Sequence, residues 1–462
     1  MEYERCQVTN WRYFRGISCL LLGLFLHGCA GYSSNIRNVE QHLVTQNYQV
    51  ALATLDKLYS GSDRDAVLYN LNKGMLLRMS GDYTASNDAF ESAKRLMEHL
   101  EAISITEQTG SMVINDEVKS YEGEVFEKVL LHFYKILNYL ELGKINEARV
   151  EVLQTDQRLK EIKQKLSRDE LPEEAWARYM SGIVFEDLGE WSDAMIAYRK
   201  SYNAYNKYKG KYKLSIPYSL KVALLRLADR QGIYDELEQY KQEFGINQWE
   251  TIAERQSKGE LIVVFNSGLA PLKKQNSATV ISPTSGQLIR ISLPAYVKRP
   301  IAASGINFQV KNQQGQLENV EIVDALAVKS LEEKMPSIVA RAAARQAIKY
   351  QAAKAANEQN NGLGLLVNLA GTLLEQADTR SWTTLPQAIY LARIPLEPGA
   401  YNLSLKIVSS YDGRDKTVNF DGIRIKAGEN VYQSFHWIPA NVTNIPGTNQ
   451  EHTRVNATYE IR

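Results

Sequence analysis

A glycine and aromatic pattern in the first half of the chain restricts it to paired antiparallel helices. Gly74 and Gly81 are seven residues apart, and Tyr83 and Phe90 follow the second glycine by two and nine residues. The same spacing recurs once further along the chain, at Gly182, Gly189, Trp191 and Tyr198. A glycine inside a helix lets a second helix approach closely, and a glycine after a helix allows a left-handed turn. The pattern therefore predicts helical hairpins.

Weaker copies of the pattern extend it over residues 29–255. Tyr48 precedes Tyr83 by 35 residues, and further copies surround Gly143 and Gly232. The pattern resembles the tetratricopeptide repeat, in which two antiparallel helices form one unit. Successive turn glycines are 62 and 46 residues apart, from Gly81 to Gly143 and from Gly143 to Gly189, so longer helices or loops must intervene. We expect four or five hairpins rather than a regular array.

The repeat resemblance implies an α-solenoid whose concave face binds a protein partner. We expect five side chains of the first helices to line that face: Arg78, Phe133, Trp176, Tyr179 and Glu186. The alternative is that this face packs on the C-terminal half of the chain. The same residues would then be structural.

A stripe of tyrosines at helical spacing follows the second complete copy of the pattern. It consists of Tyr198, Tyr202, Tyr205, Tyr208 and Tyr212, with lysines interleaved. One interpretation packs the rings inward and leaves the lysines in water. The other is an aromatic and basic surface for a glycan or an anionic polymer such as peptidoglycan.

The first 28 residues have the plan of a secretory signal peptide. Arg12 and Arg15 precede an apolar run over residues 16–26, and a small residue, Gly28, precedes the expected cleavage site. That run is shorter than the ~20 residues needed to span a bilayer. We therefore expect this segment to direct export and to be removed.

The leader ends in Leu26-His27-Gly28-Cys29, which resembles the lipobox of bacterial lipoproteins, although His27 stands where a small or β-branched residue is usual. The resemblance implies cleavage before Cys29 and lipidation of that residue. Cys6 and Cys19 lie in the leader, so Cys29 would be the one cysteine of the mature chain. Ala30 follows rather than the aspartate that retains lipoproteins in the inner membrane, which implies the outer membrane. An ordinary secretory signal is the alternative.

Charge balance argues against a nucleic-acid partner. Lys plus Arg number 54 and Asp plus Glu number 53, so the chain has no overall basic excess. After the leader, no apolar stretch reaches membrane-spanning length.

The composition shifts at residue 256, where short β-type runs separated by Gly, Pro and Asn begin. We expect a β-rich, sandwich-like domain over 256–440 with a helical insertion at about 326–377, then a polar tail over 441–462. Inside the insertion, residues 335–359 are rich in alanine and predict a helix. The apolar Leu363–Gly371 segment that follows is either a second helix buried against the sheet or a contact for a membrane or a partner protein.

Side chains that could support chemistry are sparse. The histidines after the leader are scattered, none at metal-ligand spacing, so we expect no metal and no cofactor. Asp378, Arg380 and Trp382 lie close together and form either a small polar site or a structural ion pair beneath the indole. We expect no enzymatic activity. A hydrolase with a carboxylate pair that the sequence does not reveal is the weakest alternative.

The leader, the hairpins and the segments 263–273, 335–359 and 378–386 together resemble an uncharacterised family of proteobacterial outer-membrane lipoproteins with tetratricopeptide-like repeats. We expect an α+β chain: an N-terminal α-solenoid, then a β-rich sandwich-like domain with an inserted helical hairpin. The expected function is a lipid-anchored periplasmic scaffold or adaptor, attached to the outer membrane, that binds an envelope protein in envelope or peptidoglycan assembly. The alternative is a glycan- or peptidoglycan-binding module.

Overall fold

The structure is a computed structural model. It describes residues 32–59, 63–111, 116, 119–166, 174–209, 214–282, 287–359, 363–410 and 414–443. The predicted signal peptide, Cys29 and most of the predicted polar tail lie outside the described residues. Helices occupy the first half of the described chain and strands most of the second, so the expected mixture of helix and strand is confirmed.

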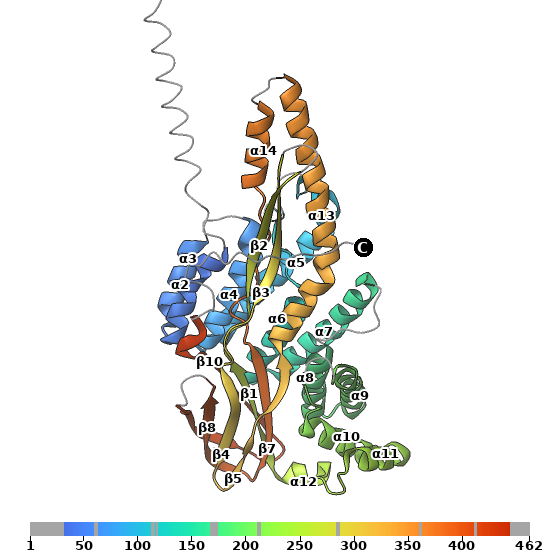
Figure 1. The fold of residues 1–462 in the computed structure, drawn as a ribbon. Coiled ribbons are helices and arrows are strands. Elements are labelled where there is room, and N and C mark those ends of the chain that lie inside the picture. The colour runs from blue at the N-terminus through green and yellow to red at the C-terminus, as the bar shows by residue number, and fades with distance from the viewer. Residues whose placement is uncertain are drawn as a thin grey trace, which may run out of the picture.

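Five helical hairpins follow one another along the first half of the chain (Figure 1). Their helices are α2 Tyr32–Val44 with α3 Tyr48–Leu58, α4 Ala66–Met79 with α5 Tyr83–Ser111, α6 Val125–Glu141 with α7 Ile145–Leu166, α8 Glu174–Asp187 with α9 Trp191–Tyr208, and α10 Tyr218–Arg230 with α11 Tyr234–Phe244. The short helices of this half are η1 Asp63–Asp65 and α12 Ile252–Ser257. The irregular spacing of the turn glycines has a simple cause, since α5 is 29 residues long.

The glycines act as their positions predict. A Cβ on Gly74 would lie 2.4 Å from the Phe90 ring, and a Cβ on Gly182 would lie 2.3 Å from the Tyr198 ring, so only glycine lets these helices approach so closely. Gly81 has φ +86°, a left-handed backbone that side chains rarely adopt, and it forms the turn between α4 and α5.

The strands form two four-stranded sheets and one separate ribbon. The first sheet has the order β10-β1-β7-β6, with strands β10 Asn430–Trp437, β1 Gly259–Ser267, β7 Ala388–Leu396 and β6 Glu318–Ile322. The second has the order β5-β4-β8-β9, with strands β5 Gln313–Gln316, β4 Ala303–Val310, β8 Gly399–Ser409 and β9 Lys416–Ile425. Strand β10 is an edge strand and runs parallel to β1, whereas the other pairings are antiparallel.

Strand β1 shows how the layers stack, because its side chains alternate between two apolar cores. Leu261, Val263 and Phe265 share a core with the second sheet, whereas Ile262 and Val264 belong to the core formed with the helices. Every residue of β1 is therefore buried. The molecule has three layers in the order helices, first sheet, second sheet.

The predicted helical insertion begins with a helix longer than the sequence suggests. Helix α13 spans Val323–Gln359 and continues through Pro336, and α14 spans Leu363–Leu373. Together with the ribbon of β2 Leu272–Ile281 and β3 Leu288–Val297, α14 and the half of α13 after Pro336 project from the body as what we call the arm (Figure 1). Of the two alternatives for Leu363–Gly371, burial of the helix is wrong: its large apolar side chains are all exposed, because α14 turns its polar side toward the ribbon. None of the described helices is long and apolar enough to cross a membrane.

Candidate functional site

The five residues predicted to line an open groove are buried instead. Their exposed fractions are 6% for Arg78, 1% for Phe133, 1% for Trp176, 0% for Tyr179 and 6% for Glu186. The first sheet covers the face on which they lie, so they do not form an open partner-binding surface. The alternative, in which this face packs on the C-terminal half, describes the structure.

Hydrogen bonds of buried tyrosines fix the helices on the sheet. Tyr134 of α6 donates to the side-chain oxygen of Asn266 at 3.1 Å, and Tyr205 of α9 donates to the carbonyl of Val320 at 2.8 Å. Both tyrosines are at most 1% exposed. Burying each hydroxyl without a partner would cost free energy, so these pairings also select one position of the helices on the sheet.

A buried charge cluster connects the same two layers. Glu186 of α8 accepts from Arg226 of α10 at 2.5 Å and from Arg393 of β7 at 3.0 Å, and Arg393 also donates to Glu260 of β1 at 2.7 Å. Burial alone would raise the pKa of Glu186, but Arg226, Arg393 and Arg255 lower it well below its usual range. The cluster is a fully paired structural network, and its carboxylates stay ionised near neutral pH.

The tyrosine stripe packs inward. Tyr198, Tyr202, Tyr205 and Tyr208 are all at most 8% exposed, and Tyr212 lies outside the described residues. The packing interpretation of the stripe is confirmed for these four rings. They do not present the exposed rings that a glycan-binding surface requires.

The cluster of Asp378, Arg380 and Trp382 is a structural ion pair. Arg380 pairs with Asp378 at 2.8 Å and with Asp65 at the start of α4 at 3.1 Å. It also donates to the backbone carbonyl of Lys119 at 2.7 Å. Trp382 is 1% exposed. The cluster therefore fastens the chain after the arm to the helical half.

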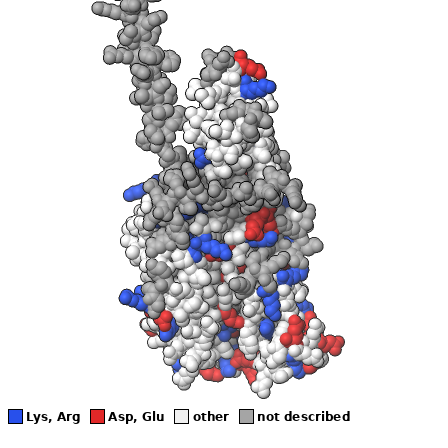
Figure 2. Space-filling view, viewed as in Figure 1, with Lys and Arg blue, Asp and Glu red and all other residues white. Residues whose placement is uncertain are grey.

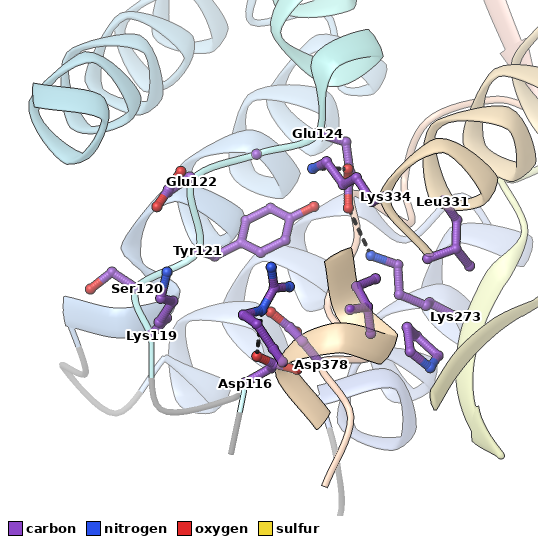
Figure 3. A pocket seen from close by; sticks show the side chains of 14 residues that line it. Asp116, Lys119, Ser120, Tyr121, Glu122, Glu124, Lys273, Leu331, Lys334 and Asp378 are labelled. Carbon is purple, nitrogen blue, oxygen red and sulfur yellow. Dashed lines mark hydrogen bonds and ion pairs between the residues drawn. The ribbon is translucent and has the colours of Figure 1, made fainter. Parts of the chain in front are cut away.

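A polar cavity of about 160 Å³ lies at the base of the arm (Figure 3). In its wall Glu124, just before α6, accepts from Lys273 of β2 at 2.9 Å and from Lys334 of α13 at 2.5 Å. These two lysines overcome the effect of burial and hold the pKa of Glu124 below its usual range. Because these opposite charges already neutralise one another, the contacts are suited to locking the arm onto the helical half rather than to chemistry.

Two further cavities lie on the outer side of edge strand β10, where hairpin turns meet the sheet. We call this strip the rim. The first cavity, of about 270 Å³, is lined by Arg78, Tyr83 and Gln433 among others. The second, of about 280 Å³, is lined by Glu186, Trp191 and Asn430 among others. The structure thus separates the five predicted residues. Arg78 lines the first rim cavity and Glu186 lines the second, whereas Phe133, Trp176 and Tyr179 lie in the hydrophobic core.

Two titratable side chains at the rim have strongly shifted pKa values. Burial raises the pKa of Asp187 to about 6, even though Tyr432 donates a hydrogen bond to it at 2.9 Å. Burial lowers the pKa of His436 to about 4, so the ring is neutral near pH 7. Its Nε2 then donates to the carbonyl of Gly268 at 2.7 Å, since a carbonyl only accepts. The sequence analysis missed both residues because their partners are distant in the chain.

Within the described part of the chain, no group of three His, Cys, Asp or Glu side chains is arranged to hold a metal ion.

Comparison with known proteins assigns the chain to no family, since no family model and no curated protein matches it. Among solved structures it is similar to a crystal structure described as nearly identical TPR-like repeats of a kinesin light chain from Podosopora anserina. That pair has 11% identity and a TM-score of 0.31, covering 46% of this chain and 91% of that one. It is also similar to PilW, a type IV pilus biogenesis factor, with 10% identity, a TM-score of 0.23, and coverage of 46% and 94%. At these identities and TM-scores, the two similarities support no conclusion about this chain beyond what its own structure shows. The class of protein, helical repeats joined to a strand-rich domain, follows from the five hairpins and the two sheets.

Proposed function

We propose that this chain is a non-catalytic, lipid-anchored scaffold on the periplasmic side of the bacterial outer membrane, and that it binds a protein partner at the rim. The proposed location rests on the leader and Cys29, and on the likeness of the chain to an uncharacterised family of proteobacterial lipoproteins. Envelope or peptidoglycan assembly is the setting.

The observation that carries the partner-binding proposal is the pair of cavities at the two ends of β10. Both open where hairpin turns lie beside an edge strand, so a partner placed there would contact both halves of the molecule. The concave face, which helical repeats commonly use, is occupied by the first sheet. The rim combines cavities with partly exposed aromatic side chains, represented by Tyr83 and Trp191.

The rim is also held in a fixed shape by side chains from the hairpins. Glu141 at the end of α6 accepts from the backbone N–H of Ser434 at 2.6 Å, and Arg78 donates to the hydroxyl of the same residue. Asp187 of α8 binds Tyr432. A preorganised surface loses little conformational entropy when a partner binds.

Photo-crosslinking in cells tests the rim. A photoreactive amino acid at Tyr83 and, separately, at Gln433 should capture the same protein, and that protein should retain the unaltered chain in a reciprocal purification. Val150, which is 51% exposed on α7 and lines neither rim cavity, is the matched control and should not capture it. Capture of different proteins at the two rim positions, or equal capture at Val150, would contradict the proposal.

The lipid attachment is tested separately. A labelled fatty acid should be incorporated into the unaltered chain and not into the Cys29→Ser variant. Incorporation without Cys29 would show that the chain is attached in another way.

A further inference from the structure

Helix α14 of the arm exposes its apolar side chains to solvent. All seven large apolar residues between Leu363 and Leu374 are exposed, with fractions from 37% at Val367 to 70% at Leu365. The helix of a soluble domain normally turns this side toward the core. An outward apolar side of this size marks a surface that meets another apolar phase.

Polar contacts fix this orientation. The side chain of Asn368 accepts from the backbone N–H of Leu288 at 3.0 Å and donates to the carbonyl of the same residue at 2.9 Å. On the side facing α13, a Cβ on Gly364 would lie 2.7 Å from the carbonyl of Ala353. The small and polar residues of α14 therefore face the arm, and rotating the helix to bury its leucines would break these contacts.

The exposed apolar surface continues beyond α14. On the neighbouring ribbon, Val280 and Ile281 are 57% and 67% exposed. In Figure 2 much of the described surface of the arm in view is uncharged, and acidic and basic side chains lie together at its tip. The exposed apolar surface thus extends from α14 onto the ribbon.

We propose that α14 and the adjoining ribbon insert into the surface layer of a lipid bilayer, as a second contact beside the lipid at Cys29; this proposal rests on the proposed function. The surface of α14 is aliphatic throughout, being built from leucine and valine without the aromatic and arginine residues that concentrate in protein interfaces. At 11 residues, about 16 Å, the helix is too short to span a bilayer and suits one that lies in its surface layer.

The start of the described chain brings a tether close to the arm. Tyr32 begins α2 and follows Cys29 by three positions, a reach of at most about 11 Å. Helix α2 is locked to the base of the arm, since Glu40 accepts from Arg299, just after β3, at 2.6 Å, and both side chains are at most 1% exposed. A lipid at Cys29 would therefore hold the base of the arm near the bilayer surface.

Vesicle flotation of the full chain carrying Cys29→Ser tests the arm without a lipid tether. With vesicles of phosphatidylethanolamine and phosphatidylglycerol at 3:1, we expect this chain to float, and 0.5 M NaCl to leave binding unchanged. Adding Leu365→Ser, Leu366→Ser and Leu369→Ser should reduce the bound fraction at least tenfold. These side chains are exposed, so an unchanged melting temperature will show that the fold is intact.

The matched control carries Val150→Ser, Leu153→Ser and Ile196→Ser, three exposed apolar positions on the body, and should float like its parent. Failure of the parent to float, or equal loss in both variants, would overturn the proposal. A parent that is dimeric in sedimentation and becomes monomeric only with the arm substitutions, without vesicle binding, would instead assign the arm to a second copy of the chain. The flotation experiment uses a chain without an acyl group and without a protein partner. A negative flotation result would therefore leave the tests of Cys29 lipidation and of partner binding at the rim unaffected.

Discussion

Arg393 of β7 holds Glu186 of α8 at 3.0 Å, and through the same guanidinium it holds Glu260 of β1 at 2.7 Å. All three side chains are at most 6% exposed. The pairing connects a helix to a strand that lies more than 200 residues later in the chain, and it links the helical layer to the first sheet.

Replacing Arg393 with methionine should lower the free energy of unfolding by about 3–5 kcal/mol, because two buried carboxylates each lose one of the guanidinium groups that neutralise them. The change can be measured from the urea midpoint. The control is Arg149→Met: its pair with Glu190 is exposed, at 37% and 30%, so its loss should cost less than about 1 kcal/mol. Similar midpoints for the two variants would show that the buried network contributes no more than a surface pair.

Gly74→Ala should destabilise the α4–α5 hairpin by about 1–3 kcal/mol, because the new methyl group would overlap the Phe90 ring. Phe90→Leu removes that ring, so the double variant should be less destabilised than the sum of the two single changes. Urea unfolding of the four chains measures the coupling. Gly143→Ala, where a Cβ meets nothing within 4 Å, should cost only the strain of its positive φ and show no coupling to Phe90→Leu. Strict additivity for Gly74 would contradict the contact.

Asp324 makes stability fall as pH rises. Burial raises its pKa from 3.8 to about 7 in the folded chain, so between about pH 4 and 7 the folded state binds more protons than the unfolded state. The free energy of unfolding must therefore decrease with pH across that window. Asp324→Asn removes the titration and should be more stable than the parent at pH 8 by roughly 4 kcal/mol, with little difference at pH 4.

Asp378→Asn provides the opposite case for the same measurement. Burial would raise the pKa of Asp378, but Arg380 lowers it below its ordinary value. The ionised carboxylate therefore stabilises the fold above its unfolded pKa, and this stabilisation is lost as pH falls. Asp378→Asn should accordingly be less stable than the parent at pH 8. Urea midpoints at pH 5 and pH 8 measure the stability of Asp324→Asn and Asp378→Asn. If both variants were stabilised at pH 8, or both destabilised, the direction of the pKa shift assigned to one of the two carboxylates would be wrong.

Arg345→Met should loosen the arm without unfolding the body. The Arg345 side chain is 0% exposed and binds Asp116 at 3.0 Å and Glu375 at 3.0 Å, which connects α13 to the residues after α14. We expect amide exchange in α14 to become at least tenfold faster, while exchange in α8 stays unchanged. Lys354→Met, at an exposed position on α13, is the control and should leave both rates as they are.

The repeat of glycine and aromatic residues was sufficient to predict the hairpins. The contact between Gly74 and Phe90, and the left-handed turn at Gly81, involve residues within 20 positions of each other, so local spacing determines them. The mixture of helix and strand, and the place where strands begin, could likewise be anticipated from composition and period.

The sequence did not predict which side chains would remain exposed to solvent. Phe133 and Tyr179 have the residue type and helical position of a binding surface, yet a sheet formed from residues 259–437 covers them. The rim residues Asp187 and His436 gave no signal, since each depends on a partner far away in the chain. Residue types alone do not reveal which side chains a later segment will bury.

The sequence by itself determined where helices pair and turn, because those choices depend on sterics between near neighbours. Only the tertiary structure decided which faces remain open. It closed the concave face of the repeats with a sheet and turned the leucines of α14 outward through the contact of Asn368 with Leu288, which lie 80 residues apart. Which faces stay exposed depends on contacts between segments that are far apart in the sequence, and these contacts form only when the whole chain folds.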